Sequence, residues 1–187
     1  MLSTQLCIIT SPVLASQVQR ASPDLSFDHL MFKFLKRQTS VSNAFIHKYM
    51  TSTLMTEMHN AVYTHLGPSK IKALSTVTLK QLASRINSLP MESEVGLFIC
   101  IREHLTYATA FAFWGPENPF ALDPSLVKNF WAYDADVVKL MVNILPRFTA
   151  RKAYYARQRL IKALEEYFRQ ERYTAADKVI QERFRLH

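Results

Sequence analysis

The sequence predicts a mainly α-helical fold: a multi-helix, partial domain with one or two short strands at its N-terminus. Glycine is scarce, with 3 residues among 187, and this disfavours phosphate-binding loops and two-residue hairpins, which need positive φ angles. Apolar residues make up 49% and charged residues 20% of the chain, a composition typical of globular proteins. Apolar side chains also recur at helical spacing along most of the chain.

The first expected elements are a strand and two helices. The β-branched run Gln5–Thr10 predicts the strand. Pro12 follows Ser11, an arrangement typical of a first helical turn, and predicts a helix over residues 12–21. A second start signal predicts a helix over residues 22–37. Because a lone strand leaves backbone groups unpaired, we expect its partner strands to lie outside this sequence.

Three helices are expected in the middle of the chain after a polar break, over residues 49–66, 69–89 and 95–115. The polar break covers residues 38–45. Gly67 and Pro68 are expected to end the first of these helices, and Pro90 the second. The third is apolar nearly all round, so we expect it to be the most buried helix of the protein.

A proline-rich connection follows residue 115, and three more helices are expected after it, over residues 124–145, 149–170 and 174–187. Their expected N-terminal caps are Asp123, Thr149 and Thr174. Prolines reduce the conformational entropy of the connection. Its aromatic side chains are expected to fix it by burial: Trp114, Phe120, Phe130 and Trp131.

The net charge of +8 is concentrated at the C-terminal end, where residues 147–187 hold eleven Lys/Arg and five Asp/Glu, a difference of +6. Such a region could contact nucleic acid or an anionic membrane surface. Tyr154 and Tyr155 lie among its cations and could stack on bases. A regular apolar stripe on the same helix instead favours a solvated helix face, so we expect no nucleic-acid binding.

Four segments, in order, resemble the cytochrome P-450 (haem-thiolate monooxygenase) family, in its fungal prostacyclin-synthase-like or sterol-7-hydroxylase-like branch. These segments are LCIITSPVLASQVQRASPDLSF (6–27), MHNAVYTHLGPSKIKAL (58–74), GLFICIREHLTYATAFAFWGPENPF (96–120) and FWAYDADVVKLMVNILPRFTARKAYYARQRLIKALEEYF (130–168). The resemblance covers essentially the whole chain. It implies that residues 1–187 form a single incomplete domain, the N-proximal part of such a fold.

The resemblance implies haem and its iron as cofactor, molecular oxygen, a partner reductase and a lipophilic substrate. Members of the family usually reside at the endoplasmic-reticulum membrane. No segment here approaches the ~20 apolar residues of a spanning helix, so we expect this chain to be cytoplasmic if soluble. We also expect oligomerisation or aggregation when it is expressed alone, because apolar helix faces that the later helices and sheet of the family's fold would cover are then exposed.

The elements that carry the family's chemistry are not evident in this chain. Glu166–Arg169 and Glu182–Arg185 match the family's Glu-x-x-Arg pattern, but such i,i+3 pairs are ordinary on helix surfaces. Cys100 lies in a helical context, whereas an iron-binding thiolate needs a loop whose amides point at the sulfur. We therefore expect no catalytic residue, no metal ligand and no monooxygenase activity from this fragment by itself.

Two residues are candidates for contacts with the haem propionates, by the same resemblance. His59 is the closest positional match to a polar or basic residue of the family, and Arg102 on the following core helix is the second. The six histidines show no metal-binding spacing, and no P-loop or serine-hydrolase motif occurs. The alternative function is a non-catalytic helical interaction module that uses the basic C-terminal helices.

Overall fold

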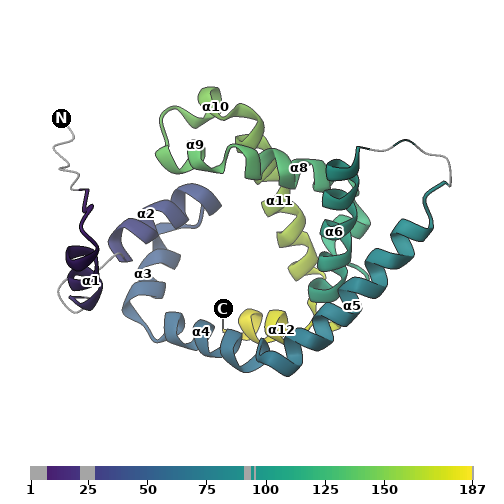
Figure 1. Cartoon of the computed structure of the whole chain (residues 1–187), viewed down its shortest axis with the longest axis horizontal. Helices are drawn as coiled ribbons and strands as arrows, with labels where there is room; N and C mark the ends of the chain where they lie inside the picture. Colours follow the sequence, from purple (N-terminus) through teal and green to yellow (C-terminus); the bar gives the residue numbers. More distant parts are fainter. Residues whose placement is uncertain (1–7, 22–27, 91–93, 95, 187) are drawn as a thin grey trace.

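The computed structural model describes residues 8–21, 28–90, 94 and 96–186 (Figure 1). All its regular elements are helices: α1 (Pro12–Arg20), α2 (Asp28–Thr39), α3 (Asn43–Thr51), α4 (Leu54–His65), α5 (Pro68–Asn87), α6 (Leu97–Trp114), α7 (Pro119–Leu122), α8 (Ser125–Ala135), α9 (Val137–Val142), α10 (Pro146–Thr149), α11 (Arg151–Arg169), the 3-10 helix η1 (Arg172–Ala175) and α12 (Lys178–Arg185). The mainly α fold class is confirmed.

The expected N-terminal strand is not found in the described ranges. Its first three residues, Cys7 among them, lie outside those ranges, and Ile8, Ile9 and Thr10 have no regular structure. The helix after it is as expected: Pro12 begins α1, and the Ser11 hydroxyl accepts a hydrogen bond from the Leu14 amide at 3.5 Å. Without a neighbouring strand to supply hydrogen-bond partners, an isolated apolar run has no sheet to join.

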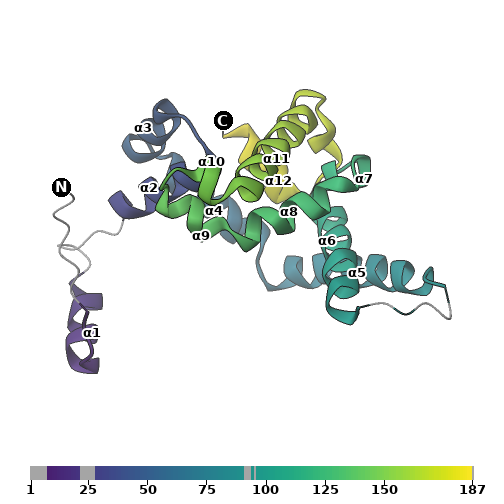
Figure 2. The same ribbon diagram turned by 90° about the horizontal axis from the view of Figure 1, so that it is seen from above.

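Most of the helices follow one another around a ring when the molecule is viewed down its shortest axis (Figure 1). The ring runs through α2, α3, α4, α12, α11, α8 and α9, and it is closed by packing of α2 against α9 and of α4 against α12. The most extensive contacts join α8 to α11 and α5 to α6. Helix α1 lies outside the ring, and Figure 2 shows it well separated from the other helices.

Helix α11 contributes most to the described core. Its buried side chains are Ala153, Ala156, Arg157 and Tyr167. The two alanines allow neighbouring helices to approach closely, and Ala153 forms a cluster with Leu140 of α9 and Ala150. Leu126 and Val127 of α8 are buried as well. The core therefore lies mainly between α11 on one side and α8 and α9 on the other.

The expectation that residues 95–115 form the most buried helix is wrong. The first half of α6 is exposed, with Leu97 at 72% and Phe98 at 74% of their accessible surface. Only Ala108 and Ala110, in its second half, are buried. Apolar composition indicates what a helix could bury, but burial needs neighbouring elements, and α6 packs mainly against α5.

Helix boundaries differ from those expected at several points. The expected helix 124–145 is divided at Asp136 into α8 and α9. Helix α9 ends at Val142 and is followed by Asn143, whose φ is 60°. The expected helix 49–66 is likewise divided at Ser52 and Thr53 into α3 and α4. Tertiary packing decides such breaks, because the two halves pack against different helices: α8 packs mainly against α11, whereas α9 packs mainly against α2.

Two of the expected caps are also wrong. Thr149 is the last residue of α10, and its hydroxyl donates to the Ile144 carbonyl at 2.7 Å. Thr174 lies within η1, whereas Asp177 caps α12 by accepting from the Val179 amide at 2.9 Å. The third expected cap lies one residue from the observed one: Pro124 is the N-cap of α8, and Asp123 before it accepts a hydrogen bond from the Ser125 amide at 3.0 Å.

The connection after α6 is fixed by aromatic packing, as expected. Trp114 packs edge to face with Tyr167, with ring centroids 5.5 Å apart, and its carbonyl accepts a 2.7 Å hydrogen bond from the Tyr167 hydroxyl. Asn118 is buried in the turn, where its side chain donates to the Gly115 carbonyl at 2.7 Å and accepts from the Ala121 amide at 3.1 Å. The contacts of Trp114 thereby join the end of α6 to Tyr167 of α11.

Candidate functional site

Arg102 lies between two aromatic rings on α6 and α8. Its guanidinium carbon is 4.7 Å from the centre of the Trp131 ring and 5.4 Å from that of Phe98, one turn earlier on α6. Cation–π contacts of this kind orient a guanidinium and reduce its freedom. The aromatic pair therefore holds Arg102 in a defined position at the α6–α8 contact.

A hydroxyl links the two helices beside this guanidinium. Thr106 donates to the Arg102 carbonyl at 2.7 Å, and it accepts from the Trp131 indole nitrogen at 3.1 Å. The sequence did not point to Thr106, and it pointed to Trp131 only as part of the aromatic packing of the proline-rich connection. The spacing of Arg102 and Thr106, four residues on a helix, would have placed them on one face, but the contribution of α8 depends on the fold.

The guanidinium of Arg102 forms no hydrogen bond or ion pair with the described residues, and its Nε is buried without a partner. Because Nε is buried, the terminal N–H groups are the ones that an approaching group can reach, and two parallel N–H groups match a carboxylate. Chemically, the arrangement can bind a carboxylate that approaches the α6–α8 contact.

The second candidate, His59, is not brought near Arg102. It is exposed on α4, a helix that packs against α3 and α12, whereas α6 packs against α5, α7, α8 and α12. No hydrogen bond or ring contact joins the two residues. His104, which the sequence did not single out, is half-buried on α6, and its Nδ1 has no hydrogen-bond partner.

Cys100 has the helical setting that the sequence predicted. It is half-buried in the first turn of α6, and its amide donates to the Gly96 carbonyl at 2.9 Å. In a helix the amides are used by carbonyls and do not converge on a side-chain sulfur. The geometry of Cys100 is therefore that of an ordinary helical cysteine.

Two neighbouring hollows lie along α11 and share some of their lining residues. One, of about 830 Å³, takes apolar side chains from α4, α11 and α12, including Met58, Phe168 and Phe184. The other, of about 350 Å³, is lined by side chains including Phe120 and Phe130. Trp114, Ile161 and Leu164 line both. Apolar hollows with few polar groups fit lipophilic ligands or apolar side chains of another segment.

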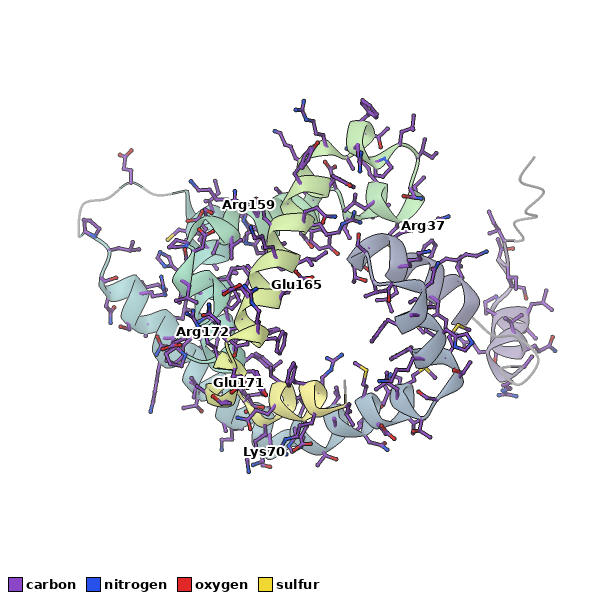
Figure 3. The ribbon with its side chains drawn as sticks, turned by 180° about the vertical axis from the view of Figure 1, so that it is seen from behind. Arg37, Lys70, Arg159, Glu165, Glu171 and Arg172 are labelled. Atoms are coloured by element: carbon purple, nitrogen blue, oxygen red, sulfur yellow. The ribbon has the colours of Figure 1, made fainter. Side chains whose placement is uncertain are left out.

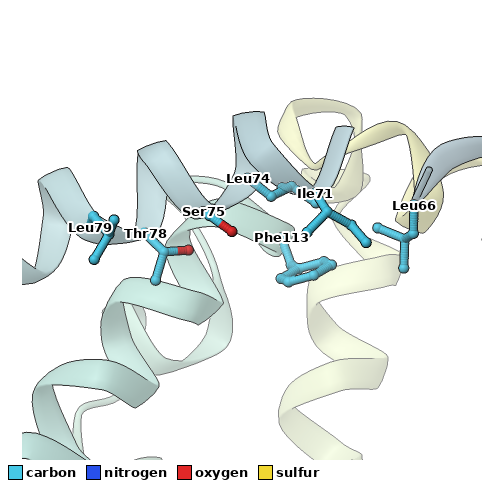
Figure 4. A pocket seen from close by; sticks show the side chains of 7 residues that line it. All are labelled: Leu66, Ile71, Leu74, Ser75, Thr78, Leu79 and Phe113. Atoms are coloured by element: carbon cyan, nitrogen blue, oxygen red, sulfur yellow. The ribbon is translucent and has the colours of Figure 1, made fainter. Parts of the chain in front are cut away.

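A further hollow, of about 550 Å³, lies along α5 (Figure 4). Leu66, Ile71 and Leu79 line it, and Phe113 of α6 points toward it from the other side (Figure 4). Ile71 and Leu79 are exposed, so this hollow is a shallow, mainly apolar surface. Its polar side chains are the hydroxyls of Ser75 and Thr78 (Figure 4).

The two Glu-x-x-Arg matches are surface pairs. Arg169 pairs with Glu166, and Arg185 lies 2.7 Å from Glu182, each within one exposed helix turn. The interpretation of these pairs as ordinary helix-surface contacts is confirmed.

Several cationic side chains of the basic C-terminal region contact acidic side chains or backbone carbonyls elsewhere in the chain. Arg159 lies 3.6 Å from Asp123, and Arg172 lies 3.6 Å from Glu117. Figure 3 labels the two arginines. Arg157 turns inward and donates to the Arg37 carbonyl. These contacts attach α11 and η1 to the connections around α7 and to the end of α2.

The described residues offer no axial thiolate of the kind that holds a haem iron. They also contain no group of three or more His, Cys, Asp or Glu side chains that could hold a metal ion by side chains alone. Cys100, the cysteine among them, lies in a helix and lacks the loop that a ligating thiolate needs. In addition, no described helix is both long enough and apolar enough to cross a bilayer.

Two curated proteins with similar sequences indicate which family this chain resembles. The chain is 26% identical over 168 residues to the cytochrome P450 monooxygenase nodJ of Hypoxylon pulicicidum, covering 88% of this chain and 32% of that protein. It is 26% identical over 165 residues to a cytochrome P450 monooxygenase of Gibberella zeae, covering 87% of this chain and 31% of the relative. No protein-family model and no solved structure matches.

The chain thus spans about a third of the length of the curated relatives it matches. The match covers nearly the same extent of this chain in both relatives. The resemblance to cytochrome P450 monooxygenases that the sequence indicated is confirmed. This family relationship implies haem as the cofactor.

Proposed function

We propose, from its relationship to fungal cytochrome P450 monooxygenases, that this chain is part of a haem-dependent monooxygenase and is inactive by itself. The observation that carries the proposal is the similarity over 88% of the chain to a relative of which it matches 32%. The activity proposed for the whole enzyme is oxidation of a lipophilic substrate with molecular oxygen and electrons from a reductase.

The exposed apolar surface supports the proposal that residues 1–187 form one incomplete domain. Among the described residues, 24 large apolar side chains are exposed, whereas 14 apolar side chains are buried. The exposed ones include consecutive residues at the start of α6, Leu97 to Ile99. Surface of this kind normally packs against another element, and further segments of the enzyme would cover it.

Arg102 is proposed to contact a haem propionate in the complete enzyme. Its guanidinium is oriented by Trp131 and Phe98 and has no partner among the described residues. A carboxylate on the cofactor is a suitable partner for such a group. His59 remains the second candidate, since its exposed position on α4 leaves it accessible to a group held by another segment.

The carbon-monoxide absorption spectrum of the reduced protein tests the proposal. We would record it for this chain mixed with haemin and for the longest reading frame that contains the chain. We expect no thiolate-type band from the chain alone and such a band from the longer polypeptide. A thiolate-type band from the chain alone that disappears with Cys100→Ala would contradict the proposed inactivity.

Arg102 is tested in the longer polypeptide by the affinity for haem. Arg102→Gln should weaken haem retention by about tenfold, the order expected for loss of a charged hydrogen bond. Arg85→Gln is the matched control, because Arg85 also stacks on an aromatic ring, with its guanidinium carbon 4.0 Å from the Tyr107 centroid. Equal effects of the two changes would rule out a specific role for Arg102.

A further inference from the structure

A separate hollow, of about 500 Å³, lies where the end of α2 meets the α9–α10 turn and the first half of α11. Four cationic side chains line it: Lys33, Lys36, Arg37 and Arg157. None of the residues that line it carries a carboxylate. Figure 3 shows Arg37 at this end of the molecule, beside the α9–α10 turn, whereas Lys70 lies on the opposite side of the ring.

Arg157 is the most buried of these cations, with 8% of its surface exposed. One of its terminal nitrogens donates to the Arg37 carbonyl, and its guanidinium lies 5.1 Å from the centre of the Tyr154 ring. Its Nε is buried and has no hydrogen-bond partner. Burying a charged donor without a carboxylate costs free energy, so the site has an uncompensated positive charge.

The other three cations add to this charge. Arg37 donates to the Met141 carbonyl at 2.9 Å, and Lys36 donates to the Asn43 side chain. Lys36 and Arg37 lie in the last turn of α2, where they also offset the helix dipole, but Lys33 lies one turn earlier. No ion pair neutralises any of the four in the part of the chain that the structure describes. Like charges in one hollow repel each other, and a bound anion would relieve that repulsion.

We propose that this hollow binds a phosphate-type anion, either free inorganic phosphate or the phosphomonoester headgroup of an acidic lipid. A phosphate group offers several oxygens and about two negative charges at neutral pH, which suits two arginines and two lysines that approach from different elements. Guanidinium groups bind such oxygens through paired N–H groups, and lysines bind them as point charges. The site is separate from Arg102 and does not depend on the proposed monooxygenase function.

Calorimetric titration of the full chain with inorganic phosphate, at constant ionic strength against chloride, tests the site. The double change Lys33→Gln and Lys36→Gln should weaken phosphate binding by about tenfold or more. Both lysines are exposed, so the changes should leave the fold intact, which circular dichroism would verify. Lys70→Gln with Lys72→Gln is the control, because it removes the same charge from exposed positions on α5 and should leave the affinity unchanged.

Vesicles distinguish the two sources of the phosphate group. We would compare phosphatidylcholine vesicles that contain phosphatidic acid with vesicles of phosphatidylcholine alone. Binding only to the vesicles with phosphatidic acid, together with loss of that binding in the Lys33 and Lys36 variant, supports a lipid headgroup as the ligand of the site. Binding of inorganic phosphate in solution with the same loss supports a free anion. The proposal is overturned if neither probe binds, or if the control pair loses binding as strongly as the Lys33 and Lys36 pair.

Discussion

At the residue scale, the turn after α6 depends on a position that a side chain cannot occupy without strain. Gly115 has a φ of 79°, and a Cβ built there would lie 2.7 Å from the Ala175 carbonyl oxygen. Both the conformation and the close approach of η1 therefore favour glycine. The scarcity of glycine in this chain makes the position easy to find by sequence, but the contact with Ala175 is visible only in the fold.

We expect Gly115→Ala to lower the free energy of unfolding by roughly 2 kcal/mol, the order of cost for a strained backbone together with a steric contact. Urea unfolding would measure it. Gly67→Ala is the control, because a Cβ at Gly67 would meet nothing closer than the Tyr63 carbonyl oxygen at 3.9 Å. Its cost should stay below about 1 kcal/mol, and equal costs at the two positions would contradict the steric argument.

Tyr167 makes the stability of the protein depend on pH in the alkaline range. Burial raises the pKa of Tyr167 from 10.0 to about 12, because the charged phenolate is disfavoured away from water. Since the unfolded state loses this proton at lower pH than the folded state, the contribution of Tyr167 is present below pH 10. It is then lost as the pH rises toward about 12.

Tyr167→Phe should therefore flatten the decline of melting temperature between pH 10 and about 12. At neutral pH it should cost about 1 kcal/mol, because the hydrogen bond from its hydroxyl to the Trp114 carbonyl is lost. Melting temperatures of both proteins across this pH range test the prediction. An unchanged alkaline slope in the variant would show that other groups cause the decline.

At the element scale, the start of α12 shows how local sequence can offer two caps and the fold can select one. Thr174 and Asp177 are both residue types that cap helices. The chain folds residues 172–175 into η1 against α11, which places Asp177 at the start of α12. Asp177 also donates its amide to the Phe113 carbonyl at 2.9 Å, so this cap joins α12 to the end of α6.

We expect Asp177→Ala to reduce the free energy of unfolding by about 1 kcal/mol, the usual cost of removing a helix cap. Thr174→Ala should change it by less than about 0.5 kcal/mol, since its side chain forms no hydrogen bond to the described residues. Chemical denaturation of the two variants provides the measurement. The reverse order of costs would support the cap that the sequence alone predicted.

At the scale of the whole molecule, the chain presents more large apolar side chains to solvent than a compact monomer of its size is expected to present. The first half of α6 and the α9–α10 turn are the clearest cases, with Leu97, Phe98, Leu145 and Phe148 all exposed. Apolar surface of this extent promotes association between copies. This is the physical reason for the expected oligomerisation of the chain.

We expect Leu97→Gln with Ile101→Gln to reduce self-association of the purified chain and its binding of hydrophobic dyes. Both side chains are exposed, so the stability of the fold should change by less than about 0.5 kcal/mol for each. Analytical ultracentrifugation and dye fluorescence would measure the effect. Leu140→Gln, at a buried position, should instead destabilise the fold. A wild-type chain that sediments as a monomer without dye binding would contradict the prediction.

Helical spacing, proline positions and scarce glycine were enough to predict a mainly α fold, the start of α1 and the helical setting of Cys100, because these depend on neighbours within a few residues. Only the tertiary structure decided which helices are buried and where the long helical segments break. It also decided that Trp131 and Thr106 accompany Arg102, and that Arg157 joins the lysines of α2. Those contacts join residues from 25 to 120 positions apart in the chain, and helical periodicity carries no information over such separations.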